Sequence, residues 1–136
     1  MQTANLKWVQ DDSYVVTTSS NHIIPIDNST KKTAPGSMEL VLAALTSCTA
    51  TDIVIILGKK RQKLESLEIE AKGERATDSP SVFTKIELIY RLRGTLDEKA
   101  VRDAIELSEK KYCSVAAMLS KTAEITYRYE ILPPQN

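Results

Sequence analysis

Hydrophobic and polar residues alternate in short runs along the first part of the chain. Residues 3–9, 13–19 and 22–26 are rich in β-branched and aromatic side chains, which favour strands. Asp11-Asp12 and Ser20-Asn21 lie between these runs and are typical turn residues. The pattern predicts three strands joined as an antiparallel meander.

A polar loop at 27–36 separates this meander from a long apolar run, which predicts a helix ending near Lys60. Ser37 is expected to be its N-cap, and Glu39 lies in its first turn, near the positive end of the helix dipole. Because the middle of the run is apolar almost all round, we expect the helix to be buried on most faces.

Period-two alternation returns in the second half of the chain. Residues 67–72 and, less strictly, 83–92 predict two long strands. A second helix is expected at about 97–110, where Thr95 or Asp97 can serve as the cap and an apolar stripe follows the helical period.

The last elements are a short helix at 115–119, for which Ser114 is the expected cap, and a strand at 122–131. The complete order is βββαββααβ, without internal repeats. This order predicts one α+β domain over residues 1–136, with an antiparallel sheet wrapped around the long central helix.

Composition excludes several classes of protein. The 18 basic and 18 acidic side chains give a formal net charge of zero, which provides no electrostatic footprint for nucleic acid or an anionic membrane. Glu39 and Asp52 make the long apolar run a poor membrane span, because charge is costly in a bilayer. Two cysteines are too few for a disulfide scaffold, and residues 1–10 lack a secretory pattern, so we expect a cytoplasmic protein.

The two cysteines are the main candidates for chemistry. Cys48 lies in the middle of the long helix, where no helix end lowers a thiol pKa, so its position alone favours simple packing. Cys113 lies at the expected N-terminal edge of the short helix, after Lys110 and Lys111, and both features favour a thiolate. Local reasoning therefore makes Cys113 the more reactive of the two, with packing equally open.

Three other polar residues are candidates for a site, namely Asp52, Glu39 and His22. Asp52 follows Cys48 by one helical turn, where a carboxylate raises a thiol pKa, so a structural bond to a backbone group or a lysine is favoured. Glu39 precedes Cys48 by nine residues, about 13.5 Å along the axis and on the opposite side. It can stabilise the helix dipole, or serve Cys48 across a dimer interface. His22 forms no metal-binding pattern with the cysteines, and the sequence contains no cofactor-binding motif.

The residues around both cysteines resemble those of one family. The segment from Pro35 to Asp52, PGSMELVLAALTSCTATD, closely resembles the central-helix signature of the OsmC/Ohr family. Residues 111–115, KYCSV, resemble the segment around that family's second cysteine, and the 64 residues between the two cysteines fit its layout. The order of elements is similar to that of the family over about residues 3–132.

The resemblance implies both a fold and a reaction. The implied fold is an intertwined homodimer, in which strands of both chains form sheets around two long central helices. The implied reaction is the reduction of organic hydroperoxides. In it Cys48 is the peroxidatic cysteine, Cys113 resolves the sulfenic acid as a disulfide, and a dithiol such as a lipoyl group reduces that disulfide.

Two family features differ in this chain. Family peroxidases use an arginine from the N-terminal strands, whereas no arginine precedes Arg61 here, so Lys31, Lys32 or a basic residue of a second chain is the candidate cation. The family glutamate lies ten residues before the first cysteine in Ohr, which is Met38 here, and Glu39 lies one residue later. The alternative function is an OsmC-fold protein without peroxidase activity that binds a small apolar ligand or senses redox state.

Overall fold

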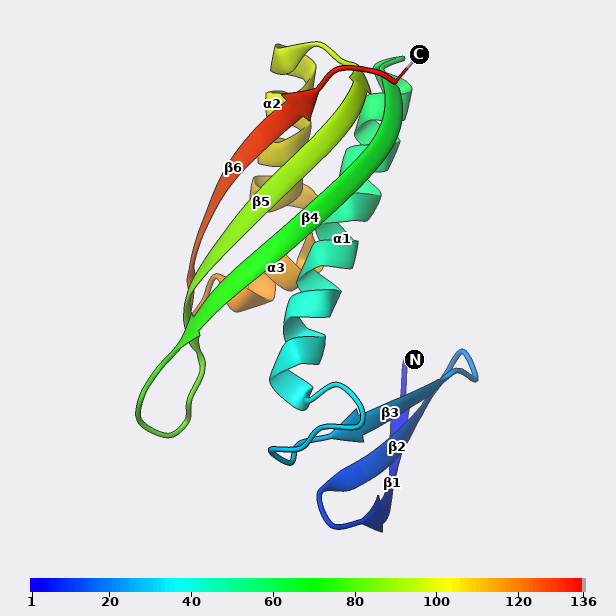
Figure 1. Cartoon of the computed structure of the whole chain (residues 1–136), viewed down its shortest axis with the longest axis vertical. Helices are drawn as coiled ribbons and strands as arrows, with labels where there is room; N and C mark the ends of the chain where they lie inside the picture. The colour runs from blue at the N-terminus through cyan, green and yellow to red at the C-terminus, as the bar shows by residue number, and fades with distance from the viewer. Residues whose placement is uncertain (136) are drawn as a thin grey trace. The chain divides into compact units, whose positions relative to one another are not determined.

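The structure, a computed structural model, describes residues 1–135. The chain forms two compact units, one from Met1 to Ala43 and the other from Ala44 onward. The long helix α1 (Ser37–Lys59) begins in the first unit and continues into the second. Figure 1 labels the helices and strands of both units.

The N-terminal unit contains the predicted meander. Strands β1 (Ala4–Gln10), β2 (Ser13–Thr18) and β3 (Ile23–Asp27) pair antiparallel in that order. Asp11 and Asn21 lie in the two turns with φ of 49° and 65°. Asp and Asn tolerate this left-handed backbone better than other non-glycine residues, so the turn prediction is confirmed together with the strands.

Gly36, rather than Ser37, is the N-cap of α1. The Gly36 N–H donates to Glu39 Oε1 at 2.9 Å. This is the capping-box bond, in which a glutamate at the third helical position accepts from the backbone N–H of the N-cap. Ser37 is instead bound by Asn28, which accepts from the Ser37 N–H at 2.8 Å and donates to its hydroxyl at 3.0 Å. The predicted cap is therefore wrong by one residue, whereas the expected first-turn position of Glu39 is confirmed.

A buried aspartate organises the loop that leads into α1. The Asp27 carboxylate accepts from the Ser29 N–H at 2.8 Å, and from the Thr33 N–H at 2.9 Å and hydroxyl at 3.0 Å. These hydrogen bonds from Ser29 and Thr33 favour the ionised form and hold the pKa of Asp27 well below its usual range. The loop is thus tied to the last residue of β3.

The second unit is built on a three-stranded sheet in the order β4-β5-β6. Its strands are β4 (Lys63–Arg75), β5 (Phe83–Thr95) and β6 (Glu124–Leu132). β4 and β5 pair antiparallel, but β5 and β6 pair parallel. The prediction of one antiparallel sheet is therefore wrong: there are two sheets, and the second is mixed because a helical crossover returns the chain to the starting end of β5.

That crossover contains a π-helix between two α-helices. Its parts are α2 (Glu98–Leu107), η1 (Ser108–Tyr112) and α3 (Ser114–Leu119). Asp97 caps α2 by accepting from the Ala100 N–H at 3.0 Å, which confirms one of the two predicted caps. In Figure 1 these helices and the adjoining part of α1 lie on one face of the β4–β6 sheet.

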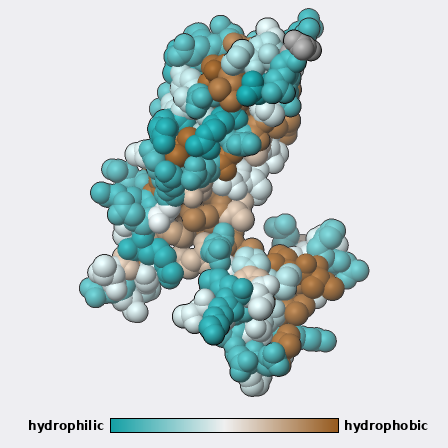
Figure 2. Space-filling model, viewed as in Figure 1, coloured by the Kyte–Doolittle hydropathy of each residue, from teal (hydrophilic) through white to brown (hydrophobic). Residues whose placement is uncertain are grey.

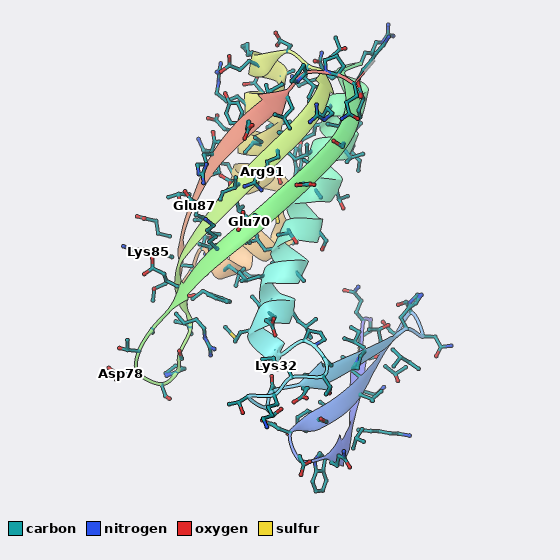
Figure 3. The ribbon with its side chains drawn as sticks, viewed as in Figure 1. Lys32, Glu70, Asp78, Lys85, Glu87 and Arg91 are labelled. Carbon is teal, nitrogen blue, oxygen red and sulfur yellow. The ribbon has the colours of Figure 1, made fainter. Side chains whose placement is uncertain are left out.

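The core of the second unit lies between this sheet and its helices. It consists of fully buried side chains from α1, β5 and α2, chiefly Leu45, Ile53, Leu57, Ile86, Leu88, Tyr90, Leu92, Val101 and Ile105. The other face of the sheet carries charged side chains, including Glu70, Glu87 and Arg91 (Figure 3). Arg91 and Glu70 form an ion pair of 3.3 Å across β5 and β4. The sheet therefore has one apolar face and one polar face.

α1 is less buried than the sequence predicts. By length and composition it could cross a membrane, with a mean hydropathy of 2.1, yet only 22% of the apolar window is buried inside the protein. Its buried residues, Leu45, Thr49, Ile53 and Leu57, recur every four positions and form one stripe, while Val54 and Ile55 are half exposed. A single sheet and two short helices cover only one side of the helix.

Candidate functional site

The two cysteines meet in the second unit. Cys48 is half-buried on α1, and Cys113 is buried between η1 and α3. The Cys48 side chain lies near enough to Cys113 to contribute to the raised pKa of the Cys113 thiol. Both thiols are free. Residues that are 65 positions apart in the sequence thus form a thiol pair without a disulfide.

Cys113 is held on both its backbone and its side chain. Its N–H donates to the Ser108 carbonyl at 2.8 Å, and this bond closes the π turn. Cys113 is also the N-cap of α3, because its Sγ accepts from the Ala116 N–H at 3.3 Å. Ser114, the predicted cap, is instead the first residue of α3, so that prediction is wrong by one residue.

Burial, and not the helix end, decides the acidity of Cys113. Its side chain is only 3% exposed, and burial together with the neighbouring Cys48 thiol raises the pKa of Cys113 to about 12. The N–H groups of Ala116 and Val115 lower this pKa but do not offset the burial. The expectation that the position of Cys113 favours a thiolate is therefore wrong, and Cys48 is the more accessible of the two thiols.

Asp52 connects α1 to the π-helix one turn beyond Cys48. Its Oδ2 accepts from the hydroxyl of Ser108 at 2.8 Å, and Ser108 is fully buried. The structural role favoured for Asp52 is therefore confirmed, although its partner is a hydroxyl and not a backbone group or a lysine. The same two elements, α1 and η1, thus contact each other through the thiols and through this hydrogen bond.

A second polar cluster, formed by Tyr90 and Glu109, lies near Cys113. The buried Tyr90 hydroxyl donates to Glu109 Oε1 at 3.5 Å and also has Thr49 within hydrogen-bonding reach. Burial raises the pKa of Glu109 to about 7, while the bond from Tyr90 and the nearby Lys110 act against that rise. Cys113 is near enough to add to the raised pKa of Tyr90.

The sequence reasoning missed Ser108, Tyr90 and Glu109. A signal was present for two of them, because Ser108 and Glu109 continue the apolar stripe of α2 from Ala104 and Ile105 at a spacing of four residues. A polar residue at a position with the period of the core needs a hydrogen-bonding partner.

A cavity of about 450 Å³ opens beside the same elements. It is lined by side chains from α1 and from the α2–η1 segment, namely Asp52, Ile55, Ile56, Lys59, Lys60, Leu107 and Tyr112. Asp52 belongs to both the cavity and the Ser108 hydrogen bond, and Tyr112 precedes Cys113 in the chain. The cavity therefore reaches to within one helical turn of Cys48 along α1.

The remaining candidate residues belong to the N-terminal unit. Glu39 is engaged there by Gly36, and His22 is exposed, with its Nδ1 2.8 Å from Ser20 Oγ. Lys32 Nζ donates to the Asp27 carbonyl at 3.3 Å in the loop before α1, where Figure 3 labels it. Within residues 1–135, no three His, Cys, Asp or Glu side chains gather into a metal site.

Comparison with known proteins identifies relatives along nearly the whole chain. A family model described as OsmC-like protein matches residues 29–128. Protein YhfA of Escherichia coli strain K12 is 40% identical over 130 residues, which cover 95% of this chain and 97% of YhfA.

Solved structures show the same fold. A hypothetical protein from Aquifex aeolicus VF5 superimposes with a TM-score of 0.91 at 30% identity, covering 99% of this chain and 98% of that one. An organic hydroperoxide resistance protein OsmC from Legionella pneumophila superimposes with a TM-score of 0.72 at 12% identity, over 94% of this chain and 96% of that chain. At 12% identity, the comparison with the Legionella pneumophila protein shows a shared fold alone.

Proposed function

Because this chain belongs to the OsmC-like protein family, we propose that it is a cysteine-based peroxidase that reduces organic hydroperoxides. The observation that carries the proposal is the thiol pair, which joins half-buried Cys48 to buried Cys113. The burial of Cys113 limits the access of peroxide to its sulfur, which suits the resolving role. Cys48 is therefore the peroxidatic residue.

The proposed cycle has three steps. The Cys48 thiolate attacks the O–O bond of the hydroperoxide, giving a sulfenic acid and an alkoxide that takes up a proton. The Cys113 sulfur then attacks the Cys48 sulfur; the S–S bond forms, the S–O bond breaks, and the Cys113 proton leaves with the hydroxyl group as water. A dithiol such as a lipoyl group finally reduces the disulfide and becomes a cyclic disulfide itself.

The cavity beside the thiol pair supports an organic substrate. Its lining includes Ile55, Ile56 and Leu107, which suit an apolar substituent better than hydrogen peroxide. Since the cycle needs free thiols at its start, we propose that the protein works in the cytoplasm, where thiols are kept reduced.

A homodimer completes the proposal. Val54 and Ile55 of α1 are 52% and 50% exposed, and a helix this apolar needs a cover. Hydrophobic surface is also visible on the N-terminal sheet in Figure 2, where Leu6, Trp8 and Ile23 are exposed. We propose that a second copy covers these surfaces, and that Glu39 and a cation such as Lys32 act on Cys48 across the interface.

Peroxide consumption with a dithiol reductant tests this function. We expect wild type to reduce an alkyl hydroperoxide, Cys48→Ser to be inactive, and Cys113→Ser to accumulate a Cys48 sulfenic acid that dimedone traps. Ser47→Ala, which changes an exposed neighbour on α1, is the matched control and should keep wild-type activity. If Cys48→Ser consumes peroxide as fast as wild type, the peroxidase proposal is wrong.

The cavity also favours the second candidate, a binding protein for a small apolar ligand. Seven residues line it, and neither cysteine is among them. Under this alternative a Cys48→Ser, Cys113→Ser double variant binds the ligand with unchanged affinity. Under the peroxidase proposal, the substrate analogue cumyl alcohol should protect Cys48 from alkylation in the wild-type protein.

A further inference from the structure

Two parallel connections join α1 to the π-helix η1. One is the thiol pair of Cys48 and Cys113, and the other is the hydrogen bond from Ser108 to Asp52 at 2.8 Å. Cys48 and Asp52 are four residues apart, so they lie on one face of α1. Ser108 and Cys113 are five residues apart, at the two ends of the π turn.

The π turn explains how both ends reach the same helix. In a regular α-helix, five steps of about 100° would place residues 108 and 113 about 140° apart around the axis. The wider turn, closed by the Cys113 N–H and the Ser108 carbonyl, lets both residues contact α1 instead. Single π turns inside α-helices are frequent at functional sites.

Ser108 connects α1 to Cys113 through both its side chain and its backbone. Its hydroxyl is bonded to Asp52, and its carbonyl accepts from the backbone of Cys113 at 2.8 Å. The side chain of Ser108 is fully buried, and its hydrogen bond goes to a carboxylate, which makes it stronger than a neutral one. The position of the Cys113 backbone is therefore tied, through one residue, to the helix that carries Cys48.

We propose that Asp52 and Ser108 are positioning residues for disulfide formation, whose hydrogen bond holds Cys113 against the Cys48 sulfur. This proposal rests on the proposed function for its biological setting, but the effect on the thiol pair does not depend on peroxide. The step concerned is the second of the cycle, in which the S–S bond forms and water leaves.

The first test separates oxidation of Cys48 from closure of the disulfide. In Ser108→Ala, sulfenic acid formation on Cys48 should stay within about twofold of wild type, measured in a Cys113→Ser background. Closure should slow by about ten- to a hundredfold in Ser108→Ala and in Asp52→Ala, because small misplacements of reacting groups have effects of that size. Asp52→Asn keeps an oxygen acceptor for Ser108 and should restore most of the closure rate.

The second test needs no peroxide. The fraction of Cys48–Cys113 disulfide is measured by mass spectrometry against the ratio of reduced to oxidised glutathione. We expect Ser108→Ala to lower the equilibrium constant for the disulfide at least tenfold, which is about 30 mV for a two-electron couple. Tyr127→Phe is the matched control, since it removes another hydroxyl–carboxylate bond, to Glu106 at 3.2 Å, that does not involve α1.

The outcomes are distinguishable. If Ser108→Ala and Asp52→Ala close the disulfide at the wild-type rate and equilibrium, or if Asp52→Asn behaves like Asp52→Ala, the positioning proposal is wrong. An equal loss in sulfenic acid formation and closure in Ser108→Ala also contradicts it, because that indicates a general structural defect. If wild type forms no sulfenic acid with any hydroperoxide, the proposed function fails, while the glutathione titration still decides the role of Asp52 and Ser108.

Discussion

At the scale of single residues, the environment of Cys113 differs most from what its sequence indicates. The neighbouring lysines and the helix N-terminus are visible in the sequence and favour a thiolate. The 3% exposure and the nearby Cys48 arise only in the folded chain. The neighbouring Lys111 contacts an aromatic ring in the folded chain, because its ammonium lies 5.3 Å from the centre of the Tyr112 ring. Sequence neighbours therefore identified the candidate thiol but not its acidity.

Burial of Cys113 leads to a prediction about its alkylation. In the Cys48→Ser protein at pH 8, we expect iodoacetamide to modify Cys113 at least tenfold more slowly than in the same chain unfolded in urea. The reasons are restricted access and the raised pKa of the thiol. Quenched mass spectrometry gives both rates, and equal rates in folded and unfolded protein would contradict the burial of this side chain.

Glu109 leads to a prediction about pH. Its pKa rises from the usual 4.5 to about 7 on folding, so the folded chain binds more protons than the unfolded chain between these values. The free energy of unfolding should therefore fall as pH rises from about 4.5 to 7. Glu109→Gln should remove that contribution, about 1 to 2 kcal/mol once the partial exposure of Glu109 is allowed for.

Urea titrations at pH 5 and pH 8 measure this effect. The difference in unfolding free energy between the two pH values should be smaller in Glu109→Gln than in wild type. Glu98→Gln is the control, since the Glu98 carboxylate also accepts from a tyrosine hydroxyl, that of Tyr129 at 3.0 Å. If wild type and Glu109→Gln show the same pH dependence, Glu109 does not titrate as inferred. The charged and titratable groups that face it are Tyr90, Glu106, Lys110 and Tyr127.

At the scale of elements, hydrophobic periodicity predicted nearly all of the secondary structure. The six strands and three α-helices occur close to their expected positions, because each carries its own period and turn residues. The π-helix was not predicted, since one additional residue in a turn leaves no pattern that differs from a helix end. The parallel pairing of β6 with β5 was also missed, because pairing direction depends on the path of the crossover.

The π turn leads to a deletion experiment. Removing Lys110, an exposed residue in the middle of the turn, shortens η1 to the length of an α-helical turn. We expect the deletion to prevent the Cys48–Cys113 disulfide from forming under oxidising conditions, because Ser108 and Cys113 can no longer both contact α1. Lys110→Ala keeps the length of the turn and should form the disulfide as wild type does, as judged by non-reducing mass spectrometry.

At the scale of the whole molecule, a single chain leaves α1 incompletely covered. Because the sequence pattern predicts a helix buried on most faces while the chain buries one stripe of it, a second copy is the proposed cover. The sequence supports this assembly through the family resemblance, and the exposed Val54 and Ile55 support it through their hydrophobicity.

A charge placed on that surface should dissociate the proposed dimer. We expect Val54→Lys to raise the dimer dissociation constant at least a hundredfold, because an unpaired charge buried in an interface costs several kcal/mol. Analytical ultracentrifugation over a range of concentrations measures the constant. Lys72→Glu, on the charged strand β4, is the control and should leave the assembly unchanged. A wild-type chain that sediments as a monomer at all concentrations contradicts the dimer.

The long sequence separation of the two cysteines determines when both thiols of the site are present during synthesis. The strands of the N-terminal meander are local in sequence and can pair early, whereas Cys113 follows β5 in the chain. Cys113 is translated 65 residues after Cys48, which takes roughly 3 to 13 s at about 5–20 residues per second. Under the proposed function, the nascent chain carries the peroxidatic Cys48 without its resolving thiol during that interval, so oxidation of Cys48 in a newly made molecule then has no internal repair.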